Sequence, residues 1–120
     1  YWNTQYRSAI TALHAGKPLV GQRVQDLRTL LNFCATNTLL KGRKIVVQAD
    51  GMNAVVVMHA AVLDERLAAA KLTRTLKTWR SYIQQPLQHD MMPNVIPGVL
   101  CCYDIPDLLV LAQGRVIIED

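Results

Sequence analysis

The chain has 120 residues, of which 51% are hydrophobic, and a formal net charge of +4. This length favours one domain, and the apolar content excludes a disordered chain. The basic residues are scattered except for one group, which comprises Lys71, Arg74, Lys77 and Arg80. Mild basicity is a weak signal, so we expect a solvated surface or an interface with an acidic neighbour, and a nucleic-acid partner is unlikely.

The cysteines carry no metal-binding pattern. Cys34, Cys101 and Cys102 form no CxxC pair, and no histidine stands at ligand spacing from them. We therefore expect free, buried thiols and neither a metal site nor a cofactor.

The first third of the chain predicts two helices, over residues 1–15 and 20–33. Apolar residues recur at helical spacing in both segments, and the sequence Gly-Lys-Pro at 16–18 separates them. The second segment has the clearer apolar stripe, formed by Val24, Leu27, Leu30 and Leu31.

Residues 44–63 predict a buried strand, a sharp turn and a buried helix. The β-branched run at 45–47 is typical of a central parallel strand covered on both faces. Asp50-Gly51 breaks this run, and glycine tolerates backbone angles that other residues resist. The next twelve residues are almost all apolar, which predicts a helix buried all round inside a body larger than this chain. They are too few for a membrane span and include His59.

The segment 67–84 allows two interpretations. Its alanine-rich start favours a helix by propensity, whereas a strand–helix unit requires a second parallel strand here. We predict a strand near 69–73 and a helix near 77–84.

The last third predicts a long proline-containing loop over 86–97, two short helices and a final strand. The helices are divided at Asp104, which we expect to be an N-cap, with Pro106 at the first helical position of the second one. The strand covers 115–118, and Glu119 and Asp120 follow it.

This order of elements resembles the α/β-hydrolase superfamily, and most of all bacterial acetyl-xylan-esterase-like and prolyl-oligopeptidase-like proteins. The matching segments are LVGQRVQDLRTLLNF, KIVVQADGMNAVVVMHAAVLD, AAAKLTRTLKTW and IPGVLCCYDIPDLLVLAQGRVIIED. The resemblance implies an α/β fold with three layers, a partial hydrolase-like parallel sheet and helices on both faces. Residues 1–120 would form the C-terminal part of such a domain. The resemblance suits a bacterial parent protein that is exported, and no residue pattern in this chain indicates a compartment by itself.

The resemblance also places a catalytic motif on this chain in altered form. Hydrolases of this family carry G-x-S-x-G at a strained strand-to-helix turn that exposes the serine. Aligned here, Ala49 takes the first small position, Asp50 the variable one, Gly51 the nucleophile position and Met52 the next. The implied function is an esterase-like module that has lost its nucleophile and serves a structural or interaction role. The alternative is a fragment of an active carboxylester hydrolase acting on acylated carbohydrate or a similar ester.

The other candidates for catalysis are carboxylates and histidines. Asp50 could act as the nucleophile only if the motif shifted by one residue, which would put Gln48 where a small residue is needed. Glu119 and Asp120 stand where the family's acid-bearing loop begins, and the family's histidine would follow a later strand. We expect His59 to be a packed core residue and His14 to lie at the surface; His89-Asp90 is the only histidine–carboxylate neighbour pair.

The expected partners follow from incompleteness of the sheet. A strand at 45–48 would have an open edge, which invites pairing with further strands. We therefore expect the remainder of a larger hydrolase-like chain, or a homo-oligomer, to cover it, and no membrane contact.

Overall fold

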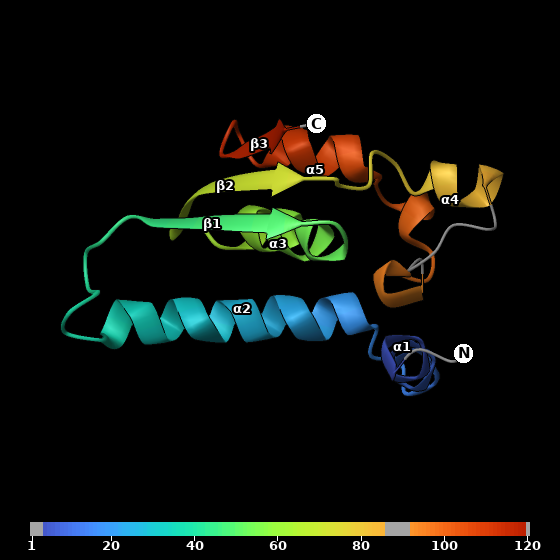
Figure 1. Ribbon diagram of the computed structural model, residues 1–120, viewed down its shortest axis with the longest axis horizontal. Helices are drawn as coiled ribbons and strands as arrows, with labels where there is room; N and C mark the ends of the chain where they lie inside the picture. Colours follow the sequence, from blue (N-terminus) through green and yellow to red (C-terminus); the bar gives the residue numbers. More distant parts are fainter. Residues whose placement is uncertain (1–3, 86–91, 120) are drawn as a thin grey trace.

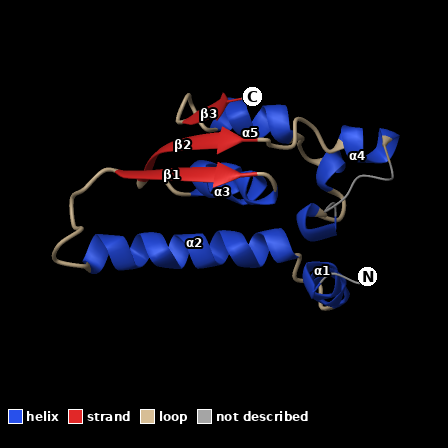
Figure 2. Ribbon diagram, viewed as in Figure 1, coloured by secondary structure: helices blue, strands red, loops and turns tan. Residues whose placement is uncertain are grey.

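The computed structural model describes residues 4–85 and 92–119, which form an α/β fold around one parallel sheet (Figure 1). Figure 2 shows the strands lying side by side, with α3 next to β1 and β2 and α5 next to β3. The α-helices are α1 (Thr4–His14), α2 (Leu19–Thr36), α3 (Met52–Leu63), α4 (Arg80–Gln84) and α5 (Ile105–Leu111). Two short 3₁₀ helices are η1 (Met92–Asn94) and η2 (Val99–Cys101), and the strands are β1 (Ile45–Asp50), β2 (Leu67–Thr73) and β3 (Val116–Glu119).

The sheet has the order β1-β2-β3, and both pairings are parallel. One row of partners, Asp50, Thr73 and Glu119, crosses it at the carboxyl ends of the strands. The predicted neighbouring parallel strands are therefore confirmed. They include the strand near 69–73, for which the composition favoured a helix. The alanine-rich segment forms β2 because it lies between β1 and β3, where pairing on both edges outweighs its intrinsic helix propensity.

Helix α3 is the centre of the core. Every residue from Ala54 to Ala61 is buried, and the helix packs against β1, β2, α2 and α5. The predicted all-round burial is therefore confirmed, although the last residue, Leu63, is 60% exposed. The other large buried side chains of the core come from α2, β2 and α5: Val20, Leu31, Leu67, Leu72 and Ile105.

One face of the sheet is open, and here the expectation of helices on both faces is not met by the described residues. Exposure alternates along β1 and β3, so that Val46 is 64% and Ile117 is 56% exposed. The topology explains this. Both crossovers run in the same direction, from β1 to β2 and from β2 to β3, and right-handed crossovers in one direction place their helices on the same face.

The first helix between β2 and β3 is shorter than expected. Helix α4 begins at Arg80 instead of near residue 77, because the Asp104 carboxylate binds the preceding two residues. The two predicted short helices on either side of Asp104 are present as η2 and α5, and the predicted N-cap is confirmed. Pro106 is the second residue of α5 and not the first, because the helix begins at Ile105. The first half of the predicted loop, residues 86–91, lies outside the described residues.

No single helix within 4–85 and 92–119 is both long and apolar enough to cross a membrane. Only the pair Met92–Cys101 and Ile105–Leu111 reaches such length and composition, and it does so as two pieces bent by 81°.

Candidate functional site

The turn between β1 and α3 consists of one residue, Gly51. Its backbone angles are φ 57° and ψ −125°, a conformation that glycine adopts readily and a residue with a Cβ resists. The Gly51 N–H donates to the Thr73 carbonyl at 3.0 Å, and its own carbonyl accepts from Ala54 N at 3.1 Å. A Cβ built on Gly51 would meet nothing within 4 Å. The turn therefore requires glycine for its backbone angles and not for lack of space.

Asp50, the last residue of β1, is held by the end of β2. The Arg74 Nε donates to Asp50 Oδ1 at 2.8 Å, and Arg74 Nη2 donates to the other carboxylate oxygen. The Thr73 hydroxyl adds a third bond at 2.8 Å. These hydrogen bonds, from Arg74 and then from Thr73, lower the pKa of Asp50 to about 2. The carboxylate is thus ionised and fixed in direction at neutral pH.

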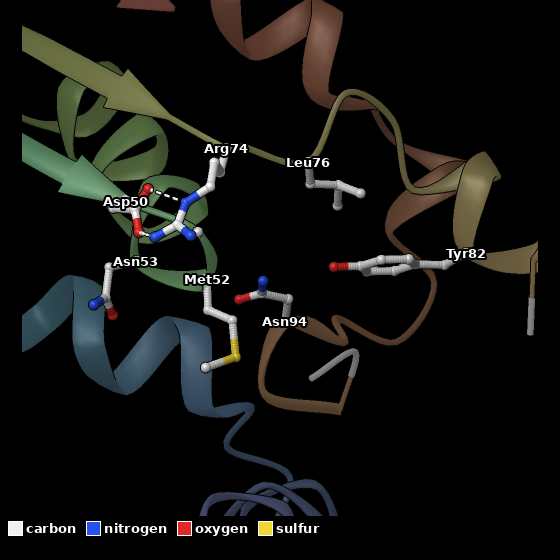
Figure 3. A pocket seen from close by; sticks show the side chains of 8 residues that line it. Asp50, Met52, Asn53, Arg74, Leu76, Tyr82 and Asn94 are labelled. Atoms are coloured by element: carbon white, nitrogen blue, oxygen red, sulfur yellow. Dashed lines mark hydrogen bonds and ion pairs between the residues drawn. The ribbon is translucent and has the colours of Figure 1, made fainter. Parts of the chain in front are cut away.

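A cleft of about 440 Å³ opens in front of this turn. Figure 3 shows the Asp50–Arg74 pair and the start of α3 on one side, and Leu76 and Tyr82 on the other. Asn94 of η1 stands between them at the base. The full lining is Asp50, Gly51, Met52, Asn53, Arg74, Leu76, Tyr82 and Asn94. The cleft lies at the carboxyl ends of parallel strands, where open α/β sheets bind their ligands.

Two of the four residues of the basic group, Lys71 and Arg74, form ion pairs. Lys71 forms an ion pair with Glu119 at 2.9 Å on the open face of the sheet, and Arg74 pairs with Asp50. Glu119, expected at the start of an acid-bearing loop, is therefore an exposed partner of Lys71 at the end of β3. Asp120 lies outside the described residues.

His59 belongs to a buried aromatic cluster. Its Nδ1 donates to the Val55 carbonyl at 2.7 Å, so Nε2 of the neutral ring accepts from the Tyr103 hydroxyl at 2.9 Å. The rings of Trp79 and Tyr103 both lie 5.8 Å from the His59 ring. Burial lowers the pKa of His59, with the bond to Val55 opposing the shift. The prediction of a packed core histidine is confirmed, and both ring nitrogens are engaged away from the cleft.

The His59 environment predicts a stability loss in mild acid. The unfolded chain binds a proton at His59 below about pH 6.5, whereas the buried ring resists it, so the free energy of unfolding falls as pH is lowered through that range. We expect His59→Gln to show a smaller loss than the wild type between about pH 7.5 and about pH 5.5 in urea titrations. His14→Gln is the control, because His14 is exposed and should keep the wild-type loss. Equal losses in all three chains would contradict the assignment.

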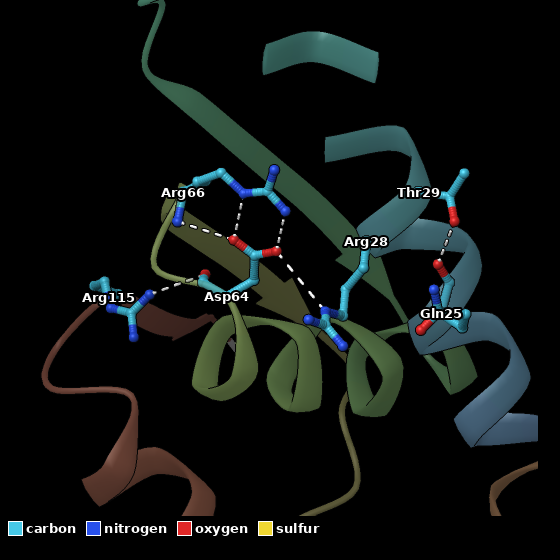
Figure 4. A network of polar contacts seen from close by, with 6 residues as sticks. All are labelled: Gln25, Arg28, Thr29, Asp64, Arg66 and Arg115. Carbon is cyan, nitrogen blue, oxygen red and sulfur yellow. Dashed lines mark hydrogen bonds and ion pairs between the residues drawn. The ribbon is translucent and has the colours of Figure 1, made fainter. Parts of the chain in front are cut away.

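A second polar network fixes the opposite end of the sheet (Figure 4). Asp64, 6% exposed, accepts from Arg66 Nε at 2.8 Å and Nη2 at 2.5 Å, and Arg28 Nε lies 3.8 Å away. The hydrogen bond from Arg66 lowers the pKa of Asp64. Arg115 Nη1 donates to the Asp64 carbonyl at 3.4 Å. The network joins the α3–β2 turn to α2 and to the start of β3, which is a structural role.

The cysteines are free, but their expected burial is wrong for two of them. Cys101 and Cys102 are exposed, because η2 buries its first residue, Val99, and turns its end to the surface, while Cys34 is partly buried. Among residues 4–85 and 92–119, no group of three or more histidine, cysteine or carboxylate side chains could hold a metal ion. His89-Asp90 lies outside the described residues.

Sequence reasoning missed several residues of the cleft, among them Arg74, Tyr82 and Asn94. Arg74 was placed in the basic group and given no site role. It directly follows β2, and Asp50 ends β1, so a parallel pairing of these strands predicts their proximity. Asn94 stands in a loop segment with no periodic pattern, and nothing in the sequence singles it out.

Comparisons with protein-family models, with curated proteins and with solved structures gave no match to this chain.

Proposed function

We propose that this chain is an α/β-hydrolase-like module without a nucleophile, which forms part of a larger hydrolase-like protein or of a homo-oligomer. It binds a ligand in the cleft in front of the Gly51 turn, which we call the elbow. The observation that carries the proposal is Gly51. A strand-to-helix turn with strained angles is what exposes the nucleophile in such enzymes, and the residue with those angles here has no side chain.

The alternative nucleophile, Asp50, is poorly suited to attack. A carboxylate nucleophile must project toward the substrate, whereas both oxygens of Asp50 are bound by Arg74 and Oδ1 also by Thr73. Its low pKa also makes it a weak proton acceptor. These contacts favour a structural role for Asp50 in holding the ends of β1 and β2 together.

The larger assembly is supported by the open parts of the sheet. Among the described strands, β1 pairs on one edge only, and the open face carries the exposed Val46 and Ile117. A hydrolase-like domain would place further strands beside β1 and helices on this face, and a second copy of the chain could cover the same surfaces.

Catalysis is tested directly with the full chain, an activated acetyl ester and a serine-reactive fluorophosphonate. We expect ester cleavage at the buffer rate and no phosphonate labelling, because Gly51 offers no attacking group. Asp50→Asn is the decisive variant, and Asp26→Asn, an exposed carboxylate of α2, is its matched control. Turnover that disappears in Asp50→Asn but persists in Asp26→Asn would overturn the proposal and identify Asp50 as the nucleophile.

A further inference from the structure

Asn94 holds an unused hydrogen-bond acceptor at the base of the cleft. The residue is 2% exposed, and its Oδ1 has no partner among the described residues. Its position is fixed by the Trp79 Nε1, which donates to the Asn94 carbonyl at 3.1 Å, and η1 packs against α1, α2 and α3. A buried acceptor without a donor carries a desolvation cost, so its persistence at a cleft points to a ligand donor.

The rest of the cleft offers both donors and acceptors without net charge. Asp50 and Arg74 cancel each other as an ion pair. Gly51 supplies no side-chain cap to the first N–H groups of α3, and of these the Ala54 N–H donates to the Gly51 carbonyl. The N–H groups of Met52 and Asn53 come before it, at the positive end of the helix beside the cleft. Figure 3 shows the Tyr82 hydroxyl pointing toward Asn94 from the far side, with its ring and Leu76 forming an apolar wall.

We propose that this cleft binds an uncharged, hydroxyl-bearing small molecule, one hydroxyl of which donates to Asn94 Oδ1. The inference rests on the proposed function, because it assigns a ligand class to the same cleft. A hydroxyl both donates and accepts, so neighbouring hydroxyls of one ligand satisfy Asn94, the Tyr82 hydroxyl and the start of α3 together. The carbon skeleton packs against Tyr82 and Leu76, and about 440 Å³ admits a ligand of monosaccharide size.

Charged ligands fit the polar groups of this cleft less well. An anion would meet the Asp50 carboxylate and the Asn94 oxygen, and Arg74 is already paired. A cation would meet the positive end of α3 and the Arg74 guanidinium. The uncharged ligand is the only class of the three that opposes none of these groups.

The test uses three probes that share one ring: glucose, glucuronate and glucosamine. Ligand-observed saturation-transfer NMR on the full chain, in the oligomeric state in which it purifies, gives their dissociation constants. We expect glucose to bind more tightly than either charged probe. Preferential binding of glucuronate or glucosamine over glucose, or binding of none of the three, would overturn the inference. The catalytic test measures ester cleavage, so its result does not depend on this outcome.

Two variants separate ligand binding from folding. Asn94→Leu should weaken glucose binding at least about tenfold while leaving the melting temperature equal or higher, since it removes a buried acceptor without a partner. Tyr82→Phe, which loses one hydroxyl, should weaken it less and serves as the second variant if Asn94→Leu does not fold. Asn32→Leu on the exposed side of α2 is the control and should bind glucose as the wild type does. Unchanged glucose binding in Tyr82→Phe, or in a folded Asn94→Leu, would refute the assignment.

Discussion

Leu72→Ala is expected to lower the free energy of unfolding by about 2–5 kcal/mol. Leu72 is 0% exposed and lies on β2, the central strand, within the core that α3 covers. Truncation removes buried apolar surface and leaves a cavity between two rigid elements. Because the total free energy of unfolding of a native domain is about 5–15 kcal/mol, this loss is a large share of its stability.

Urea denaturation followed by circular dichroism measures this loss. Leu39→Ala makes the same chemical change at a side chain that is 80% exposed, and we expect it to stay within about 0.5 kcal/mol of the wild type. Similar losses in both variants would mean that β2 does not lie at the centre of the core.

Gly51→Ser is expected to cost about 1–3 kcal/mol of stability and to restore no esterase activity. The cost comes from the positive φ of 57°, since a Cβ at this position meets no atom within 4 Å. Activity stays absent because His59, the buried histidine of α3, uses both ring nitrogens in other bonds.

The matched control for Gly51 is Gly21 in helix α2. Its φ is not positive and a Cβ there also meets nothing, so Gly21→Ala should raise stability by up to about 1 kcal/mol. Opposite signs for the two substitutions would establish backbone strain as the cause, while a neutral Gly51→Ser would show that the elbow relaxes around a side chain.

The sequence was most informative where several local signals agree. In the 44–63 stretch, β-branched residues, then Asp50-Gly51, then an unbroken apolar run predict strand, turn and helix in the order found. Asp104 and Pro106 likewise marked the start of α5 correctly. For β2, composition and topology disagreed, and the requirement for a parallel partner proved the better guide.

The covering of the sheet could not be predicted in the same way. Ile45, Val46 and Val47 are equally apolar, yet Val46 faces the open side, because a strand alternates its side chains whatever their type. Which face receives helices depends on the direction of successive crossovers, and that direction is a property of the whole sheet.

The cleft was predictable only in part, because its residues come from four separate elements and loops. Asp50 and Gly51 were found through a local motif. Asn94 reaches the cleft because Trp79, fifteen positions earlier, binds its carbonyl. Such contacts depend on the folded path of the chain and leave no local pattern.

One carboxylate joins two distant parts of the molecule. Asp104 Oδ1 accepts from the backbone N–H groups of both Trp79 and Ile105, at 2.7 Å each, while Oδ2 accepts from the Thr78 hydroxyl. The segment leading to Tyr82 and the N-terminal cap of α5 therefore depend on the same carboxylate. In amide hydrogen exchange, Trp79 and Ile105 should become labelled in one shared opening event, which makes the wall of the cleft and the helix before β3 a single cooperative unit.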